Sequence, residues 1–570
     1  MSFLAPLFRS FQPLENPLGF GASDFLELAL AVFLVTLILL RPWIEAIWPL
    51  VASKTAWCML LLALLPVALW LALLPGHPVP AATTPIEFSR LLEADTLRHF
   101  RFANPPHKYP QFFETFFVLQ EPTYSSIDPV GQGLPFMIGR VILGTAWGGV
   151  VLSVAALCAL CYWMLLGWTT PGWALAGGLL AVLEFGPLNL WMNVYSGGAF
   201  AAAAGCLVFG ALPRLKESWR ARYALILGGG VALDLLTSPY ESIFLVLGGV
   251  LYFLLSHARR RWRPLAKAAA IVFAAVLPAI GVMLLENQQV TGHWATTPKA
   301  LSQYQYGVPS PLTFQAGAVP HRQLTPQQQL NYKIQAGAPG SYFERLEYRI
   351  RYYRFFFLPP LYLALIAFLA TLREFRFQWV ALTLLLFALG VNFLPTFEFH
   401  DLAVCVCLFI LMSVAGLRQL SFVKISGWSA GRDAASLLLL LCAAHFLLWY
   451  GAHLFDDREW PTALRQYEVW DAINHSSGNF RTAISRRLDA EPGRQLVFVR
   501  YWPAHFLQNE WVYNAADIDS ARVVWARDLG EPEDEKLRGY YKDRTAWILE
   551  PDARPPRLTR YQSSQFEPVQ

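Results

Sequence analysis

Charged side chains are scarce in this sequence. Only 15% of the 570 residues are Asp, Glu, Lys or Arg, whereas 55% are hydrophobic. Soluble globular domains carry about a quarter charged residues, so this composition excludes an ordinary soluble protein. Apolar runs of about 17–25 residues, the length that crosses a bilayer, recur along the chain. We therefore expect an all-α polytopic membrane protein with the lipid bilayer as a partner, and we expect no nucleic-acid partner.

Cysteine is missing from the polar loops. Every cysteine lies in an apolar run, and the pairs Cys158/Cys161 and Cys405/Cys407 lack a nearby His or further Cys at metal-binding spacing. The sequence therefore predicts neither a disulfide framework nor a zinc site. We expect small buried hydrophobic side chains at all seven positions, which are Cys58, Cys158, Cys161, Cys206, Cys405, Cys407 and Cys442.

The familiar nucleotide and hydrolase motifs are also missing. The chain has no Walker-type phosphate loop, no HExxH, no GxSxG and no convincing cleavable signal peptide. Nucleotide-driven chemistry is therefore not indicated. If the protein catalyses a reaction, we expect its activated donor to carry its own leaving group.

The apolar runs predict about twelve transmembrane spans. The run 134–167 is too long for one crossing, so we expect a re-entrant or tilted entry over 134–145 and a span after it. The full set is 25–41, 56–75, 134–167, 171–189, 191–213, 222–238, 240–256, 265–286, 355–372, 377–395, 399–419 and 434–452.

Basic connections between these spans predict their orientation. With alternating crossings they all fall on one face, which should be cytoplasmic because Lys and Arg accumulate there. A membrane domain over 1–455 would then place its loops 76–133 and 287–354 outside, together with the tail. The connections are 41–54, 213–222, 257–267, 372–376 and 418–432.

The tail 456–570 differs in composition, because it is polar and mixed in charge. An amphipathic helix is expected over 465–488, and short β-type runs over 495–502, 521–527 and 545–550. This order predicts a small α/β domain with a partly parallel sheet.

Ionisable residues gather at the predicted outer ends of the spans. Because such groups are costly at membrane depth, they tend to line a cavity or to find a partner. The alternative is a set of solvated helix ends. The residues are Glu184, Asp234, Glu241, Glu286, Glu398, His400 and Asp401.

Two carboxylates in the first outer loop are candidate catalytic groups. Asp95 lies in a short amphipathic helix, where it suits a general base or a ligand of a divalent metal; the alternative is an ion pair with Arg98 or His99. Glu114 has apolar neighbours on both sides, which either raises its pKa or requires a partner.

Several cations are candidates for binding a phosphate. Arg140 lies inside the apolar run FMIGRVIL, where it either pairs with a carboxylate or grips a phosphate. The others are Lys108, Lys299, Arg349, Arg351 and Arg354. For the three arginines of YRIRYYRFFF, ordinary anchoring at the membrane interface is the alternative.

The order of these motifs resembles that of the GT-C superfamily of membrane glycosyltransferases. The similarity lies in ADTLRHFRFANPPH (94–107), FFETF (112–116) and PVGQGLPFMIGR (129–140), and it is close to an uncharacterised bacterial glycosyltransferase-like group. Such enzymes use polyprenyl-phosphate sugars and include O-mannosyl and aminoarabinose transferases. Where the family has Lys/Arg-Pro-Pro or Tyr-Pro-Pro, this chain has Ile127-Asp128-Pro129-Val130.

The resemblance implies an inverting glycosyltransferase in a bacterial inner membrane. Asp95 would be the base, Glu114 would orient the acceptor or sugar or share a divalent metal, and Arg140 or the arginines 349–354 would hold the lipid phosphate. The acceptor would be a glycolipid, polysaccharide or protein. Two rival interpretations stay open, a transporter or flippase and a non-catalytic membrane scaffold that presents the tail.

Overall fold

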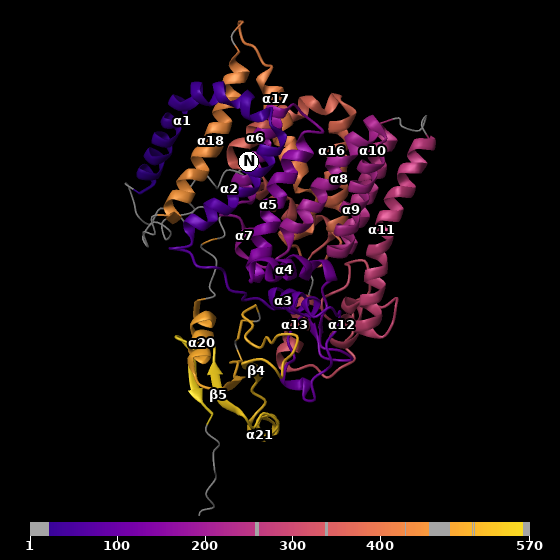
Figure 1. Ribbon diagram of the computed structural model, residues 1–570, viewed down its shortest axis with the longest axis vertical. Helices are drawn as coiled ribbons and strands as arrows, with labels where there is room; N and C mark the ends of the chain where they lie inside the picture. The colour runs from indigo at the N-terminus through magenta and orange to yellow at the C-terminus, as the bar shows by residue number, and fades with distance from the viewer. Residues whose placement is uncertain are drawn as a thin grey trace, which may run out of the picture.

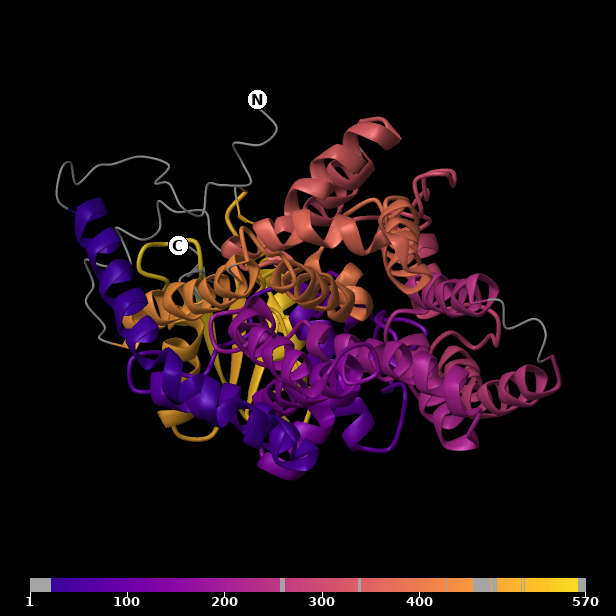
Figure 2. The same ribbon diagram turned by 90° about the horizontal axis from the view of Figure 1, so that it is seen from above.

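The computed structural model describes residues 22–256, 262–336, 340–427, 429–454, 473, 479–503, 505–506 and 508–561. A bundle of long helices forms most of it, and a smaller α/β unit built from the C-terminal residues lies at one end of the bundle (Figure 1). Seen from above, the bundle covers the C-terminal sheet (Figure 2). The tail predicted to begin at 456 is described only in part, since 455–472 and 474–478 lie outside the described residues.

The helices of the bundle follow the predicted apolar runs closely. They are α1 (Ala22–Ala52), α2 (Thr55–Leu73), α4 (Val130–Leu143), α5 (Ala146–Leu165), α6 (Pro171–Phe185), α8 (Gly198–Ser218), α9 (Ala221–Thr237), α10 (Pro239–Leu255), α11 (Trp262–Thr291), α15 (Tyr362–Phe368), α16 (Phe375–Val391), α17 (Val406–Ser421) and α18 (Ala430–Leu454). Short 3-10 segments extend some of them: η4 (Tyr353–Phe356), η5 (Pro359–Leu361), η6 (Leu369–Arg373) and η7 (Phe399–Cys405).

Among the described residues, seven helices are long and apolar enough to cross a membrane. The segments 342–356 and 359–373 meet at a bend of 108° and make an eighth if they form one broken span. Four shorter apolar helices, α4, α6, α10 and α16, accompany them. The multi-pass architecture is thus confirmed, whereas the number twelve and the sidedness stay predictions.

The predicted interruption of the run 134–167 is present. Gly144, with φ of +75°, separates α4 from α5 in a left-handed conformation that glycine adopts without strain. The two helices then pack closely, because a Cβ on Gly149 would lie only 1.9 Å from the carbonyl oxygen of Pro135.

Small elements cover one end of the bundle. They are α3 (Pro85–Arg98), η2 (Pro110–Phe112), β1 (Val118–Leu119), β2 (Ser125–Ser126), α7 (Leu190–Asn193), α12 (Pro298–Tyr306), α13 (Pro326–Ala336) and α14 (Tyr342–Tyr352). Helix α3 begins at a capping box, in which the Thr84 hydroxyl accepts from the Glu87 backbone and the Glu87 carboxylate accepts from the Thr84 backbone.

The C-terminal unit is a four-stranded sheet with the order β4-β3-β5-β6. Strands β3 (Arg494–Val499), β4 (Val523–Arg527) and β5 (Arg544–Glu550) are parallel, and β6 (Arg557–Arg560) is antiparallel to β5, so the predicted strands and partly parallel sheet are confirmed. Helices α20 (Asn479–Ala490) and α21 (Glu531–Tyr540) complete it.

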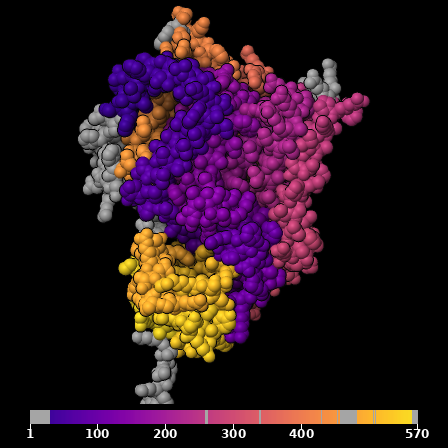
Figure 3. All heavy atoms as spheres, in the orientation of Figure 1, coloured from indigo at the N-terminus to yellow at the C-terminus, as the bar shows by residue number. Residues whose placement is uncertain are grey.

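The sheet packs directly against the first polar loop. Leu496 and Phe498 share one hydrophobic cluster with Leu92 of α3 and with Phe112 and Phe113 of the loop. The space-filling view shows the yellow C-terminal residues pressed against the violet segment that carries this loop (Figure 3). The loop is therefore clamped between the bundle and the sheet.

Adding a methyl group at the α4–α5 contact is expected to destabilise the fold. Gly149→Ala places a Cβ against the Pro135 carbonyl, and overpacking of this kind costs about 1–3 kcal/mol. Gly229→Ala is the matched control, because a Cβ there meets no atom within 4 Å. Thermal unfolding in detergent should show a lower transition for Gly149→Ala alone, and equal transitions for the two variants would contradict the packing described.

Candidate functional site

A cavity of about 390 Å³ lies where α3, the first polar loop and the bundle meet. Its walls come from α3, from residues 127–132, from the start of α10, from the end of α11 and from residues 394–401. Gln508 of the C-terminal unit also lines it. Segments far apart in the sequence therefore enclose one space, whose volume is in the range of small-molecule sites.

Arg90 is the central cation of this cavity. Its side chain is only 2% exposed, and Nη1 donates to the carbonyl oxygen of Ser196 at 2.8 Å. Nη2 lies 3.4 Å from Nε2 of His400, and Nε lies 3.7 Å from Oδ2 of Asp128. The Nε–H makes no hydrogen bond to any described residue, so the buried guanidinium keeps one donor for a ligand.

The His400 ring lies between Arg90 and a second charged group, the Glu398 carboxylate. The His400 ring lies 3.1 Å from the carboxylate of Glu398 through Nδ1 and 3.6 Å from that of Asp401 through Nε2. Burial raises the pKa of the Glu398 carboxyl, but the charge and hydrogen bond of His400, with help from Arg90 and Lys299, outweigh it and lower the pKa to about 2. Glu398 is therefore ionised and fixes the orientation of the His400 ring.

Two carboxylates near Arg90 were not singled out by the sequence. Burial raises the pKa of Asp128, although the nearby Arg90 charge opposes the rise, and Oδ2 of Asp128 accepts no hydrogen bond from the described residues. Glu93 lies deeper, 1% exposed, where burial and then the charges of Glu286 and Asp128 raise its pKa. The cavity thus combines the Arg90 cation with the Asp128 carboxyl, and Glu93 lies buried behind the lining.

The glycines of PVGQGLP bring these groups together. A Cβ on Gly131 would lie 2.6 Å from the Leu236 backbone, and a Cβ on Gly133 would lie 2.5 Å from Cγ of Glu93. Between them, the Gln132 amide donates to the carbonyl oxygen of Thr237 at 2.9 Å. The motif therefore holds α4 tightly against α3 and α9 and keeps the loop that carries Asp128 over the cavity.

Only some of the ionisable residues at the predicted outer ends of the spans line this cavity. Glu241, Glu286, Glu398, His400 and Asp401 line the cavity, as does Lys299. Glu184 and Asp234 are buried in α6 and α9, accept no hydrogen bond at either carboxylate oxygen from the described residues, and do not line the cavity. For these two, the predicted place in a shared substrate cavity is corrected.

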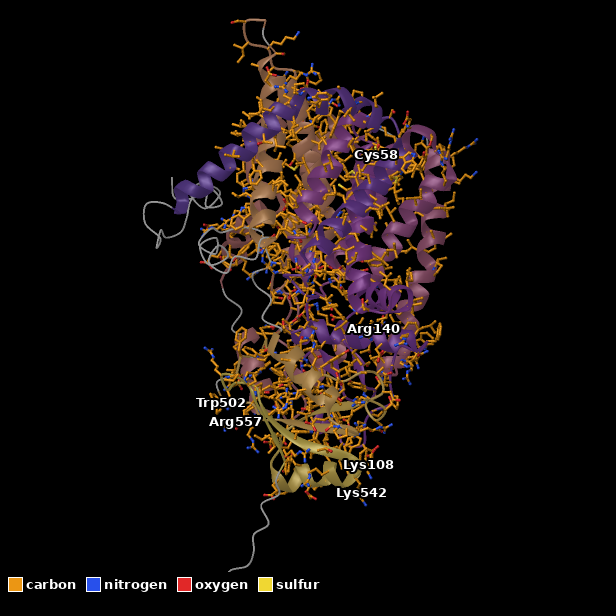
Figure 4. All side chains as sticks on the ribbon, turned by 60° about the vertical axis from the view of Figure 1, so that its left-hand side comes forward. Cys58, Lys108, Arg140, Trp502, Lys542 and Arg557 are labelled. Carbon is orange, nitrogen blue, oxygen red and sulfur yellow. The ribbon has the colours of Figure 1, made fainter. Side chains whose placement is uncertain are left out.

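Asp95 and Arg140 form a pair outside the lining of this cavity. Oδ1 of Asp95 accepts from Nη1 of Arg140 at 3.0 Å, and Oδ2 accepts from the backbone N–H of Ala516 at 2.9 Å. Of the two alternatives for Arg140, the structure shows the pairing with a carboxylate. Figure 4 places Arg140 at the junction of the bundle and the C-terminal unit. Both carboxylate oxygens of Asp95 accept hydrogen bonds, so this residue links the bundle to the C-terminal unit. Its role as the general base stays a prediction.

Glu114 and Lys108 also lie away from the cavity lining. The Glu114 carboxylate accepts from the Gln328 amide at 3.1 Å, and burial raises its pKa. The Lys108 ammonium lies 5.5 Å from the centre of the Tyr109 ring, and Figure 4 shows it beside Lys542 at the far end of the C-terminal unit. Asp95, Glu114 and Arg140 do not line the cavity that contains Arg90, so a cavity shared by these three residues stays a prediction.

The three arginines near the start of the broken span serve packing. Arg349 donates to the carbonyl oxygens of Val391 and Leu394 at 2.8 and 2.7 Å. Arg351 pairs with Glu347 at 2.7 Å on a half-exposed surface, and the Arg354 guanidinium lies over the Phe355 ring. None of the three lines the cavity that contains Arg90, so phosphate binding by these arginines and their anchoring at the membrane interface both stay predictions.

The sequence analysis named a divalent metal only as a candidate partner of Asp95 and Glu114. Within the part of the chain that the structure describes, no group of three or more His, Cys, Asp or Glu side chains is arranged to hold a metal ion. All seven cysteines are free and buried, as predicted.

Sequence reasoning missed Arg90, Glu93 and Asp128. A signal was available for the first two, because Glu87, Arg90 and Glu93 recur every three residues and so share one face of α3. Asp128 had a weaker signal, as a charged residue directly before Pro129 in the motif that leads into α4.

The fold is similar to that of known membrane enzymes. No protein-family model matches the sequence, and a search of curated proteins gives no match. The chain resembles ArnT from Cupriavidus metallidurans in the apo state, with a TM-score of 0.50 and 11% identity over 87% of this chain and 93% of that one.

Two further structures resemble the chain less closely. ArnT from Cupriavidus metallidurans bound to undecaprenyl phosphate gives a TM-score of 0.49 and 12% identity over 87% and 93% of the two chains. The Archaeoglobus fulgidus oligosaccharyltransferase in the apo form gives a TM-score of 0.44 and 10% identity, over 87% of this chain and 69% of that one. At such identities a likeness shows the fold alone, and the match to apo ArnT shows that this chain shares the fold of that protein.

Removing the Asp95 charge should loosen the junction of the bundle and the C-terminal unit. Asp95→Asn leaves Arg140 without its partner and weakens the bond to the Ala516 amide, at a cost of about 1–3 kcal/mol. Hydrogen exchange at Ala516 should accelerate in this variant. Asp543→Asn is the control, because its carboxylate is exposed and pairs only loosely with Arg494; equal exchange in both variants would contradict the holding role.

Proposed function

We propose that the chain is a membrane glycosyltransferase that moves a sugar from a polyprenyl-phosphate donor to a hydroxyl group of an acceptor. It would act at the outer face of a bacterial inner membrane, on a glycolipid, polysaccharide or protein. The likeness to the fold of ArnT supports the architecture. The observation that carries the proposal is the buried Arg90 with its unused Nε–H, set beside Asp128 in an enclosed cavity.

The cavity cations suit the leaving phosphate. Arg90 Nε–H and the Lys299 ammonium are charged donors, which bind phosphate oxygens about twice as strongly as neutral donors do. Because the Ser196 carbonyl oxygen holds the Arg90 guanidinium in place, its charge is already in position when negative charge develops on the departing phosphate. The lipid chain would remain in the bilayer while the phosphate and sugar enter the cavity.

Asp128 is our candidate for the general base. Its Oδ2 has no hydrogen-bond donor among the described residues, and its raised pKa brings it nearer to the pH at which a base works best. Asp128 would take the proton of the acceptor hydroxyl, the hydroxyl oxygen would bond to the anomeric carbon, and the bond from that carbon to the phosphate oxygen would break. A single displacement of this kind inverts the anomeric configuration.

Transfer of labelled sugar from polyprenyl phosphate to membrane extracts tests the proposal. Asp128→Asn should lower kcat/KM by roughly 10²–10⁴-fold, the usual contribution of a general base. Arg90→Gln should weaken donor binding as well. Glu535→Gln, an exposed residue of α21, should leave transfer unchanged.

The same assay separates the two candidate bases. If Asp95→Asn abolishes transfer in a chain whose Ala516 exchange is normal while Asp128→Asn retains it, then Asp95 is the base and Asp128 is not. Absence of transfer by the wild-type chain from every polyprenyl-phosphate sugar offered would count against the function itself.

A further inference from the structure

Two carboxylates that line the main cavity, the one that contains Arg90, have no role in the proposed transfer. Glu241 lies in the first turn of α10 and Glu286 lies near the end of α11. Glu241 is 9% exposed and Glu286 is 4% exposed. Both residues are therefore at least nine-tenths buried, although they border a space large enough for a small molecule.

No described side chain balances either carboxylate. The donors that reach them are backbone N–H groups, that of Val130 for Glu286 and its own for Glu241. Neither group accepts a hydrogen bond from a described side chain or forms an ion pair with one. Because buried polar groups normally find partners and a carboxylate is an acceptor, the two residues indicate a ligand that donates hydrogen bonds.

The other carboxylates of the lining already have partners. Glu398 lies 3.1 Å from Nδ1 of His400. Asp401 accepts from the backbone N–H of Glu398 at 2.8 Å. Asp128 lies 3.7 Å from Nε of Arg90. The two remaining carboxylates are thus the acceptors that a ligand would find available.

Access to the cavity separates Glu241 and Glu286 from other buried carboxylates. Both carboxylate oxygens of Glu184, and both of Asp234, are sealed from solvent, and neither residue lines the cavity. The oxygens of Glu241 and Glu286 are not sealed in this way. A ligand in the cavity can therefore reach these two groups directly.

The two acceptors have different surroundings in the cavity. Asp128 is the lining charge that acts on Glu286, whereas Asp401 and Lys299 act on Glu241. One ligand would therefore meet them through two different donor groups. The cavity volume of about 390 Å³ accommodates a sugar ring, whose hydroxyl groups are such donors.

We propose that Glu241 and Glu286 each accept a hydrogen bond from a hydroxyl group of the transferred sugar. The inference rests on the proposed function, because the sugar is the one attached to the donor phosphate. The two residues select a sugar with free hydroxyl groups at two positions, since a sugar that lacks one of them leaves a buried carboxylate unpaired. They determine specificity and take no part in the bonds that form and break.

Displacement of labelled decaprenyl phosphate from the purified full-length chain tests this assignment. Decaprenyl phosphate carrying glucose, mannose or galactose competes first, and the tightest binder is then compared with each of its mono-deoxy forms. We expect loss of a hydroxyl at two positions to weaken competition by roughly tenfold or more, the effect of leaving a buried acceptor unpaired. Glu241→Leu should remove the penalty at one position and Glu286→Leu at the other. The corresponding Gln variants should keep part of it, because an amide oxygen still accepts.

Glu184→Leu is the matched control. It removes a similarly buried carboxylate outside the cavity lining and should keep both penalties. If labelled decaprenyl phosphate does not bind the wild-type chain, the proposed function itself fails. If it binds but no deoxy form competes less well than its parent sugar, or if both penalties persist in both Leu variants, this inference alone is overturned. If one Leu variant does not fold, the other and the Gln variants decide.

Discussion

The burial of one guanidinium governs the geometry of the main cavity. A buried ion costs several kcal/mol unless partners surround it. Arg90 meets this demand with the Ser196 carbonyl oxygen and the Asp128 carboxylate, which come from two distant segments. Because both groups stabilise the same cation, the segments that carry them are held together. The cavity is the space left between them.

Helix α3, which carries Arg90, also makes hydrogen bonds to the bundle and to the C-terminal unit. Its Glu87 carboxylate accepts from the backbone of Thr83 and Thr84 and, through the other oxygen, from the N–H of Tyr195 at 3.0 Å. Two residues beyond Glu93, the Asp95 carboxylate accepts from the backbone N–H of Ala516. A single helix thus contacts the bundle, the cavity and the C-terminal unit.

Local patterns predicted most of the fold. Apolar length identified the helices, and the excessive length of the run 134–167 indicated the break that the structure shows at Gly144. Alternating β-branched and aromatic residues located β3, β4 and β5. The site was predicted less well, because its groups meet only through contacts such as that of Asp95 with Ala516, 421 residues along the chain. Nothing local distinguishes a carboxylate that lines a cavity from one that accepts a backbone N–H.

The central claim is that a donor phosphate lies against Arg90 rather than Arg140. Cryo-electron microscopy of the chain with a non-transferable polyprenyl-phosphate sugar tests it most directly. The account predicts phosphate density within hydrogen-bond distance of Arg90 Nε and near Lys299, with the sugar toward Asp128. Phosphate density at Arg140, with the pair to Asp95 broken, would contradict it.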